Sequence, residues 1–264
     1  MTEAAYLDID SRGVATITLN RPDVHNAFDD RLIVHLIGLI NQAREDERTR
    51  VLLLASTGKS FSAGADLAWM RRMADASRDD NLRDARNLAL LMETLNAFPA
   101  PTVAKVQGAV MGGGVGLVSC CDIAIASEAA FFALSEVKLG LAPAAISPYV
   151  IAKMGVSQAR RYFVSGERFS AIRAAAVGLV HEVVLAVELD DKVEHMLAAL
   201  LANGPQAMRA AKQLVQVSNP LKVSQELAEY TAGVIADLRA SDEGKEGLRA
   251  FLEKSTPSWI KAGH

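Results

Sequence analysis

Residues 103–126 read VAKVQGAVMGGGVGLVSCCDIAIA, and this stretch decides the fold. A short apolar run at 103–106 is followed by the glycine triplet 112–114, an apolar segment at 115–121 and a second short run at 123–126. Glycines placed directly before a longer apolar segment predict a helix that begins at a tight turn, and the two flanking runs predict buried strands. The stretch therefore predicts strand, glycine loop, helix and strand in succession.

The same order of elements continues toward the N-terminus. Residues 6–9 and 14–19, separated by the turn signal Ser11-Arg12-Gly13, predict a β-hairpin. Asp29 is a candidate N-cap for a helix that ends near residue 44, residues 51–55 predict a buried strand, and residues 82–95 have the apolar spacing of a helix. Residues 60–67 are rich in small side chains and predict a loop. Alternating strands and helices predict an α/β fold of stacked units, although no sequence repeat of fixed period supports it.

The C-terminal part lacks strand patterns. After Asn203-Gly204-Pro205, residues 207–217, 221–238 and 244–252 all predict helices. We expect a core over residues 1–203 and a helical appendage over residues 204–264.

Composition narrows the class of protein. The chain has 264 residues, of which half are hydrophobic, and a formal net charge of −3, which disfavours nucleic-acid binding and excludes a disordered chain. Its two cysteines are adjacent, Cys120 and Cys121, so neither a disulfide framework nor a CxxC metal site is expected. No apolar run reaches the roughly 18 residues of a spanning helix, and the first residues lack a secretory pattern. We expect a cytoplasmic protein without membrane partners.

Two turns made of small residues are the candidate chemical sites. Phosphate-loop, dinucleotide-binding, nucleophile-elbow and HExxH zinc motifs are absent from the sequence. Ala63-Gly64-Ala65 and Gly112-Gly113-Gly114 each follow a predicted strand, and such turns leave backbone N–H groups uncovered. Two N–H groups that converge on one point would form an oxyanion hole, although glycine triplets are more often only tight turns.

Read together, the motifs resemble the enoyl-CoA hydratase/isomerase (crotonase) family over nearly the full length. The residues that carry the resemblance are Arg21-Pro22-x-x-x-Asn26-Ala27-Phe28, Phe61-Ser62-Ala63-Gly64-Ala65-Asp66-Leu67, Gly108-x-x-x-Gly112-Gly113-Gly114, Cys121-Asp122-Ile123-Ala124, Gly178-Leu179-Val180 and residues 246–254. The resemblance implies a spiral of ββα units whose helical C-terminal part packs on neighbouring subunits, giving homotrimers or dimers of trimers.

The resemblance also assigns binding roles. It implies an acyl-CoA substrate, with coenzyme A as its carrier and no other cofactor or metal. Ala65 and Gly113 would donate hydrogen bonds to the thioester oxygen. Coenzyme A would contact Val24, His25, Ala27, Ala63, Asp66 and Leu67, and Lys254 would approach its phosphates.

Family hydratases use two glutamates, and this chain has only one of them. Gly116 stands where the first would be, whereas Glu136 matches the second. Glu136 is therefore the acid/base candidate, and the alternative is a solvated strand residue. A single glutamate also fits the family's Δ3,Δ2-enoyl-CoA isomerases, so isomerase stays open beside hydratase. A non-catalytic acyl-CoA-binding protein is the third possibility.

Residues 134–149, together with Gly116, resemble bacterial hydratases of 3-methylglutaconyl-CoA and isohexenylglutaconyl-CoA, which serve leucine and acyclic-terpene breakdown. The small residues Gly116 and Ala144-Ala145 would leave room for a branch at the β-carbon. Both substrates carry an additional carboxylate, which needs a cation or several N–H partners. Lys138 is the first candidate, because an extended segment would put it on the same face as Glu136. Arg71 and Arg72 are the others.

Overall fold

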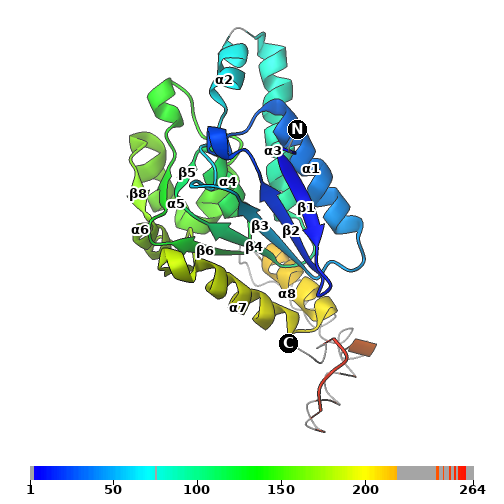
Figure 1. The fold of residues 1–264 in the computed structure, drawn as a ribbon. Coiled ribbons are helices and arrows are strands. Elements are labelled where there is room, and N and C mark those ends of the chain that lie inside the picture. The colour runs from blue at the N-terminus through cyan, green and yellow to red at the C-terminus, as the bar shows by residue number, and fades with distance from the viewer. Residues whose placement is uncertain are drawn as a thin grey trace.

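A six-stranded sheet with strand order β1-β2-β3-β4-β6-β9 forms the centre of the molecule (Figure 1). The computed structural model describes residues 3–74, 76–218, 242–243, 246, 250, 253 and 255–259. The six strands are β1 (Ala5–Ile9), β2 (Val14–Leu19), β3 (Val51–Ser56), β4 (Thr102–Val106), β6 (Ile123–Ser127) and β9 (Glu182–Val184). β1 and β2 form the predicted antiparallel hairpin, and the other neighbouring pairs of this sheet are parallel.

Both faces of this sheet are covered, so it is the middle of three layers. In β3, Leu52 and Leu54 face one hydrophobic core, and Val51 and Leu53 face another. Helices α1 (Asp30–Glu45), α3 (Arg78–Asn96) and α4 (Gly113–Cys120) contribute to the first core, and α7 (Leu189–Leu201) covers the second. Burial on both faces explains why β3 is a continuous apolar run.

A second, smaller stack of extended segments lies beside the main sheet and carries the loops with small residues. Its sheet consists of β5 (Ala109–Met111), β7 (Phe131–Ala133) and β8 (Phe169–Ser170). Single bridges between Ser62 and Val110 and between Phe28 and Ala65 add two more neighbouring segments. The chain thus runs β4–β5–α4 and then β6–β7–α5, where α5 is Ser147–Ser165, as predicted for ββα units. The strands β5, β7 and β8 were not predicted, because two or three residues carry no recognisable periodicity.

The helices predicted within the described residues are confirmed, but α5 and α7, among others, were not predicted. Asp29 is the N-cap of α1, and its side chain accepts a hydrogen bond from Leu32 N at 2.8 Å. Residues 67–74 form helix α2 (Leu67–Ala74), which the sequence analysis did not predict, and α3 begins at Arg78 after the N-cap Ser77. The remaining short elements are η1 (Pro22–Val24), η2 (Glu136–Leu139), α6 (Ala171–Ala176) and η3 (Ala186–Glu188).

Helix α8 (Pro205–Val217) confirms the first helix predicted after residue 203. Three of its side chains donate to main-chain oxygens of the core: Arg209 to Thr49 at 3.3 Å, Lys212 to Ala100 at 3.1 Å and Gln216 to Asn96 at 3.2 Å. The predicted helix 221–238 and most of residues 244–252 lie outside the described residues. Among the helices that the structure describes, none is long and apolar enough to cross a membrane.

Candidate active site

Ala65 and Gly113 each present a backbone N–H group without an acceptor among the described residues. Phe28 holds the segment around Ala65 from one side, because Phe28 N donates to Gly64 O and Asp66 N donates to Phe28 O, both at 2.7 Å. This pairing leaves the N–H group of Ala65 itself free. Gly113 is the first residue of α4, where N–H groups have no partner within the helix.

The two N–H groups belong to segments that pack backbone against backbone. Ser62 N donates to Ala109 O at 3.1 Å, and Met111 N donates to Ser62 O at 2.9 Å. A Cβ atom at Gly64 would lie 2.9 Å from Met111 O, and one at Gly113 would lie 2.6 Å from the Phe28 ring. Glycine is needed at both positions because any side chain would separate the segments. The two turns that the sequence analysis singled out therefore belong to segments that lie against each other.

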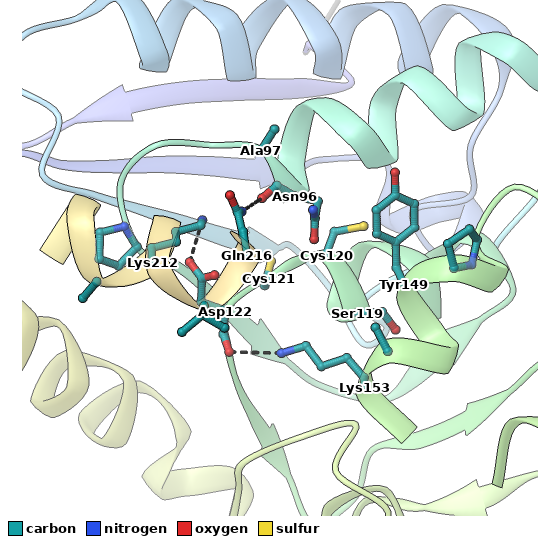
Figure 2. Close-up of a pocket in the computed structure, with 15 residues that line it drawn as sticks. Asn96, Ala97, Ser119, Cys120, Cys121, Asp122, Tyr149, Lys153, Lys212 and Gln216 are labelled. Carbon is teal, nitrogen blue, oxygen red and sulfur yellow. Dashed lines mark hydrogen bonds and ion pairs between the residues drawn. The ribbon is translucent and has the colours of Figure 1, made fainter. Parts of the chain in front are cut away.

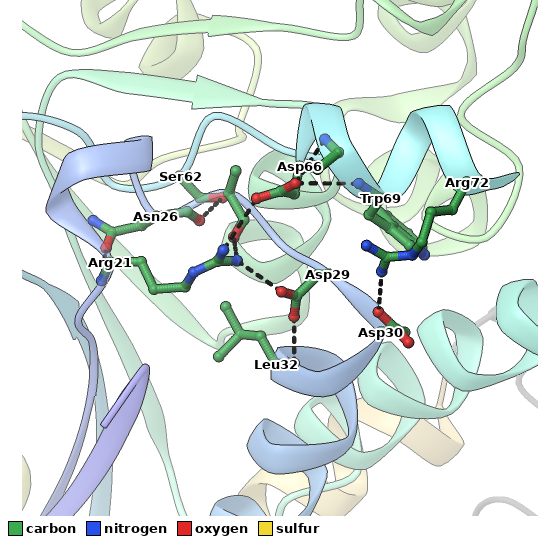
Figure 3. A network of polar contacts seen from close by, with 11 residues as sticks. Arg21, Asn26, Asp29, Asp30, Leu32, Ser62, Asp66, Trp69 and Arg72 are labelled. Atoms are coloured by element: carbon green, nitrogen blue, oxygen red, sulfur yellow. Dashed lines mark hydrogen bonds and ion pairs between the residues drawn. The ribbon is translucent and has the colours of Figure 1, made fainter. Parts of the chain in front are cut away.

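A network of polar contacts fixes the loop that precedes α2 (Figure 3). The Asn26 amide accepts from Arg21 N at 2.8 Å and donates to Thr57 O at 2.8 Å and Ser60 O at 2.9 Å. Ser62 Oγ donates to Asn26 O at 2.9 Å and accepts from Gly64 N at 3.2 Å. Asn26 is fully buried and has a φ of 55°, a left-handed conformation that asparagine tolerates better than most residues.

Arg21 and Asp66 complete this network. The Arg21 guanidinium lies 3.0 Å from Asp66 Oδ2 and 3.3 Å from Asp29 Oδ2, and it donates to Ala27 O at 2.8 Å. Asp66 Oδ1 accepts from the N–H groups of Ala68 and Trp69, so Asp66 caps the start of α2. Burial acts to raise the pKa of Asp66, but the two backbone N–H groups and Arg21 outweigh it and lower that pKa.

This geometry gives Ala27 and Asp66, two of the predicted coenzyme A contact residues, a role within the protein. Asp66 uses its carboxylate, its N–H group and its carbonyl within the protein, and Ala27 is buried with its N–H and carbonyl groups bonded to Val24 and Arg21. Neither residue offers a free polar group, because both hold the loop together. Arg21 and Asn26 belong to a motif noted in the sequence, but their spacing alone did not indicate this positioning role.

The other predicted contact residues lie around the same turns. Val24 and Leu67 are exposed apolar residues on the segments that flank the Ala65 loop. His25 is exposed, its carbonyl accepts from Ala63 N at 2.9 Å, and its Nδ1 lies 3.1 Å from Ser60 Oγ. Ala63 is half-buried. Lys254 lies outside the described residues.

Glu136 points its carboxylate at the glycine turn that begins α4. Its Oε1 lies 2.9 Å from the position that a Cβ atom of Gly112 would occupy. Its Oε2 is buried and has no hydrogen-bond partner among the described residues. Burial raises the pKa of the Glu136 carboxyl above its ordinary value. The alternative of a solvated strand residue is therefore wrong.

Lys138 does not share a face with Glu136. Residues 136–139 form the 3₁₀ helix η2 rather than an extended segment, so positions two apart point in different directions. The exposed Lys138 side chain runs past Gly166, whose added Cβ would lie 3.2 Å from Lys138 Cε. Arg71 is exposed, and Arg72 forms an ion pair with Asp30 at 2.7 Å.

The space above Gly116 is filled, which corrects the expectation of room for a substrate branch there. A Cβ atom at Gly116 would lie 2.9 Å from Ile146 Cβ and 3.1 Å from Met92 Sδ. Ile146 is 2% exposed and Met92 is fully buried. No pattern in the sequence indicates this contact, because Met92, Gly116 and Ile146 are far apart along the chain.

A cavity of about 830 Å³ lies at the other end of α4 (Figure 2). Asn96, Cys120, Tyr149, Lys153 and Lys212 are among the residues that line it. Lys153 Nζ donates to Asp122 O at 3.1 Å, and burial lowers its pKa. No group of three or more metal-ligating side chains occurs in the part of the chain that the structure describes.

Comparisons with known proteins agree with these features. The sequence profile of the family described as Enoyl-CoA hydratase/isomerase matches residues 10–262. A solved structure described as a putative enoyl-CoA hydratase/isomerase (crotonase) from Legionella pneumophila has a TM-score of 0.93 at 44% identity, covering 97% of this chain and 98% of that one. The 2,3-dehydroadipyl-CoA hydratase of Escherichia coli is 34% identical over 93% of this chain and 94% of its own length. The trans-2-decenoyl-[acyl-carrier-protein] isomerase of Streptococcus mutans is 30% identical over 94% of both chains.

Proposed function

Because the chain belongs to the enoyl-CoA hydratase/isomerase (crotonase) family, we propose that it adds water across the α,β double bond of a branched enoyl-CoA thioester. The substrate is of the 3-methylglutaconyl-CoA or isohexenylglutaconyl-CoA type. One observation carries the proposal: Glu136 points Oε1 at the glycine turn that also presents the N–H group of Gly113, and its Oε2 is buried without a partner among the described residues.

The N–H groups of Ala65 and Gly113 stabilise the negative charge that develops on the thioester oxygen. Preorganised donors of this kind are worth about 10² to 10³ in rate for each hydrogen bond. The positive end of α4 adds to the same field, because Gly113 is its first residue. The enolate formed when water attacks Cβ is therefore held in place by the backbone.

Glu136 performs both proton transfers in this proposal. Hydration joins a water oxygen to Cβ and a proton to Cα. The Glu136 carboxylate accepts a proton from the attacking water, and the carboxyl group then returns a proton to Cα of the enolate. The raised pKa of Glu136 suits this exchange, because a group that titrates closer to neutrality both accepts and releases a proton readily.

A Δ3,Δ2-enoyl-CoA isomerase is the second candidate, and the surroundings of Gly116 favour it. The family's first glutamate would stand at this position, but Ile146 and Met92 fill the space. An isomerase needs only one carboxylate, which removes a proton from one carbon and delivers it to another. The isomerase among the relatives supports keeping this candidate.

Other parts of the proposal rest on the resemblance. Coenzyme A passes Val24, His25, Ala63 and Leu67, and the additional substrate carboxylate meets Arg71. Exposure supports this assignment, since Val24 is 41% exposed and Leu67 is 71% exposed. Lys254 would approach the coenzyme A phosphates, and the subunits would assemble as a homotrimer or a dimer of trimers.

A panel of linear and branched enoyl-CoA thioesters tests the proposed activity. Products are separated by chromatography and identified by mass spectrometry. Conversion of a branched glutaconyl-CoA to its 3-hydroxyacyl thioester supports the hydratase. A shifted double bond without added water identifies an isomerase, and tight binding without any product identifies a non-catalytic acyl-CoA-binding protein.

A further inference from the structure

Three helices contribute one buried layer beside the middle of α4. Met92 comes from α3, Gly116 from α4, and Ile146 from the N-cap position of α5. α4 packs against both α3 and α5. Met92 is fully buried and Ile146 is 2% exposed, and both side chains lie against Gly116.

The 830 Å³ cavity begins directly behind this layer. Each of the three helices contributes one residue to the cavity wall about one turn further along: Asn96 on α3, Cys120 on α4 and Tyr149 on α5 (Figure 2). Cys120 Sγ lies 3.7 Å from Met92 Sδ, so the layer and the cavity wall touch. A single layer of side chains therefore separates the cavity from the N-terminal half of α4, where Gly113 and Glu136 lie.

We propose that Ile146 is the inner stop of the acyl-binding site and makes the enzyme selective for short acyl chains. The inference rests on the proposed function, because it takes the thioester to lie at Gly113. From Gly113 to Gly116, α4 rises about 4.5 Å, roughly the length of a segment of three or four carbons. A longer chain directed along α4 meets the Ile146 side chain before it reaches the cavity.

This stop separates the two substrate types left open by the sequence. The acyl group of 3-methylglutaconyl-CoA is short, whereas isohexenylglutaconyl-CoA carries a long branch. The Ile146 stop selects the short branched acyl group. Among the described residues no side chain fills the cavity behind the stop, and a smaller residue at position 146 would open this cavity to the acyl chain.

Binding and turnover across a chain-length series test the proposal. Affinities of saturated butanoyl-, hexanoyl-, octanoyl- and decanoyl-CoA are measured by calorimetry, and kcat/KM is measured for the matching 2-enoyl-CoAs. The variants are Ile146→Ala, the milder Ile146→Val, and Ile40→Ala as a matched control. Ile40 is also buried, at 3% exposure, but lies on α1 rather than on α3, α4 or α5.

We expect the wild-type affinity to fall between butanoyl- and hexanoyl-CoA, because only about three or four carbons fit before the stop. Ile146→Ala should bind octanoyl-CoA at least about tenfold more tightly than the wild type, since each methylene newly buried adds several-fold. Ile146→Val should show a smaller shift in the same direction, and Ile40→Ala should keep the wild-type profile. Affinity for butanoyl-CoA should stay within about threefold in all variants, because the changes lie beyond the short chain.

An unchanged chain-length profile in folded Ile146→Ala and Ile146→Val would overturn the stop, as would equal wild-type affinity for butanoyl- and decanoyl-CoA. The same shift in Ile40→Ala would also overturn it, since the effect would then follow general loosening of the core. The two proposals fail separately. Absence of turnover with the expected affinity profile rejects the proposed function and supports the stop, whereas turnover with an unchanged profile does the reverse.

Discussion

Glu136 illustrates how one residue is prepared for its chemistry by what surrounds it. Its Oε2 is buried without a partner, and no cation forms an ion pair with it among the described side chains. A buried acid of this kind lowers the stability of the folded protein at neutral pH, because burial disfavours its charged form. A glutamate that lowers folding stability at this place, beside a glycine turn with free N–H groups, indicates a functional role.

The pH dependence of kcat/KM tests the environment of Glu136. Burial raises its pKa, and a base must be ionised to act, so activity should fall as the pH decreases through that raised pKa. The acid limb should therefore lie above the ordinary range of a glutamate and show a slope of one proton. A limb at the ordinary glutamate pKa, or a slope of two protons, would contradict the single-carboxylate account.

The same pKa shift makes a prediction about stability. The folded state holds the Glu136 proton more tightly than the unfolded state, so the free energy of unfolding should decrease as the pH rises through the interval between the two pKa values. Glu136→Gln removes this effect. We expect the variant to be at least as stable as the wild type at neutral pH, and its relative advantage to disappear in acid, as measured by denaturant titrations at both pH values.

Gly116→Glu should not restore a two-carboxylate site. The new side chain would overlap Ile146 and Met92, and overpacking a buried position costs about 1–3 kcal/mol before the charge is considered. We expect a less stable protein with no gain in hydration, measured by denaturation and by kcat/KM on the branched substrate. A marked increase in the hydration rate would show that the side chains around Gly116 can rearrange, and it would contradict the account in which Glu136 is the only catalytic carboxylate.

At the scale of elements, the loop before α2 is held by side chains rather than by a strand ladder. The Asn26 amide makes three hydrogen bonds to backbone groups, and Arg21 and Ser62 connect it to the segment around Ala65. Because Ala65 presents its N–H group from this loop, the network positions one half of the oxyanion hole.

Asn26→Ala should therefore affect both stability and catalysis. The change leaves Thr57 O, Ser60 O and Arg21 N without their partner and puts alanine in a left-handed conformation. We expect a loss of about 3 kcal/mol in the free energy of unfolding and at least about a tenfold lower kcat.

Asn203→Ala is the matched control, since within the described part of the chain the exposed Asn203 amide bonds only to Ala199 O at 3.1 Å. This variant should change stability by less than about 0.5 kcal/mol and leave kcat unchanged. Equal effects of the two variants, or full activity in a folded Asn26→Ala protein, would contradict the proposed role of Asn26 in positioning the Ala65 loop.

Much of this architecture could be predicted from the sequence, and the exceptions have physical reasons. The hairpin β1–β2, the cap Asp29 and the glycine entry to α4 are local signals, which depend on neighbouring residues. The short strands β5, β7 and β8 exist because the spiral places them side by side. Ile146 packs against Gly116, which is likewise a contact between distant segments. The glycine therefore suggested room for a substrate branch, but the Ile146 side chain occupies that room.

At the scale of the whole molecule, α8 is attached differently from the other helices. Its side chains Arg209, Lys212 and Gln216 bond to the core, while Val215 is 72% exposed. Arg50 supports the same junction by donating to Leu201 O at 3.0 Å and Asn203 O at 2.8 Å.

The expected assembly is directly measurable. Light scattering coupled to size-exclusion chromatography should give three or six times the monomer mass at micromolar concentration. A monomer under these conditions would contradict the homotrimer and the dimer of trimers alike.

Turnover of a branched 2-enoyl-CoA in ¹⁸O-labelled water by the wild type and by Glu136→Gln tests the central claim most directly. The wild type should form a 3-hydroxyacyl-CoA that carries the label. Glu136→Gln should lose about 10² to 10⁴ in rate while it binds the saturated thioester as tightly as the wild type, since the amide keeps the shape but cannot transfer protons. More than half the wild-type rate in the variant, or a product without the label, would contradict the account.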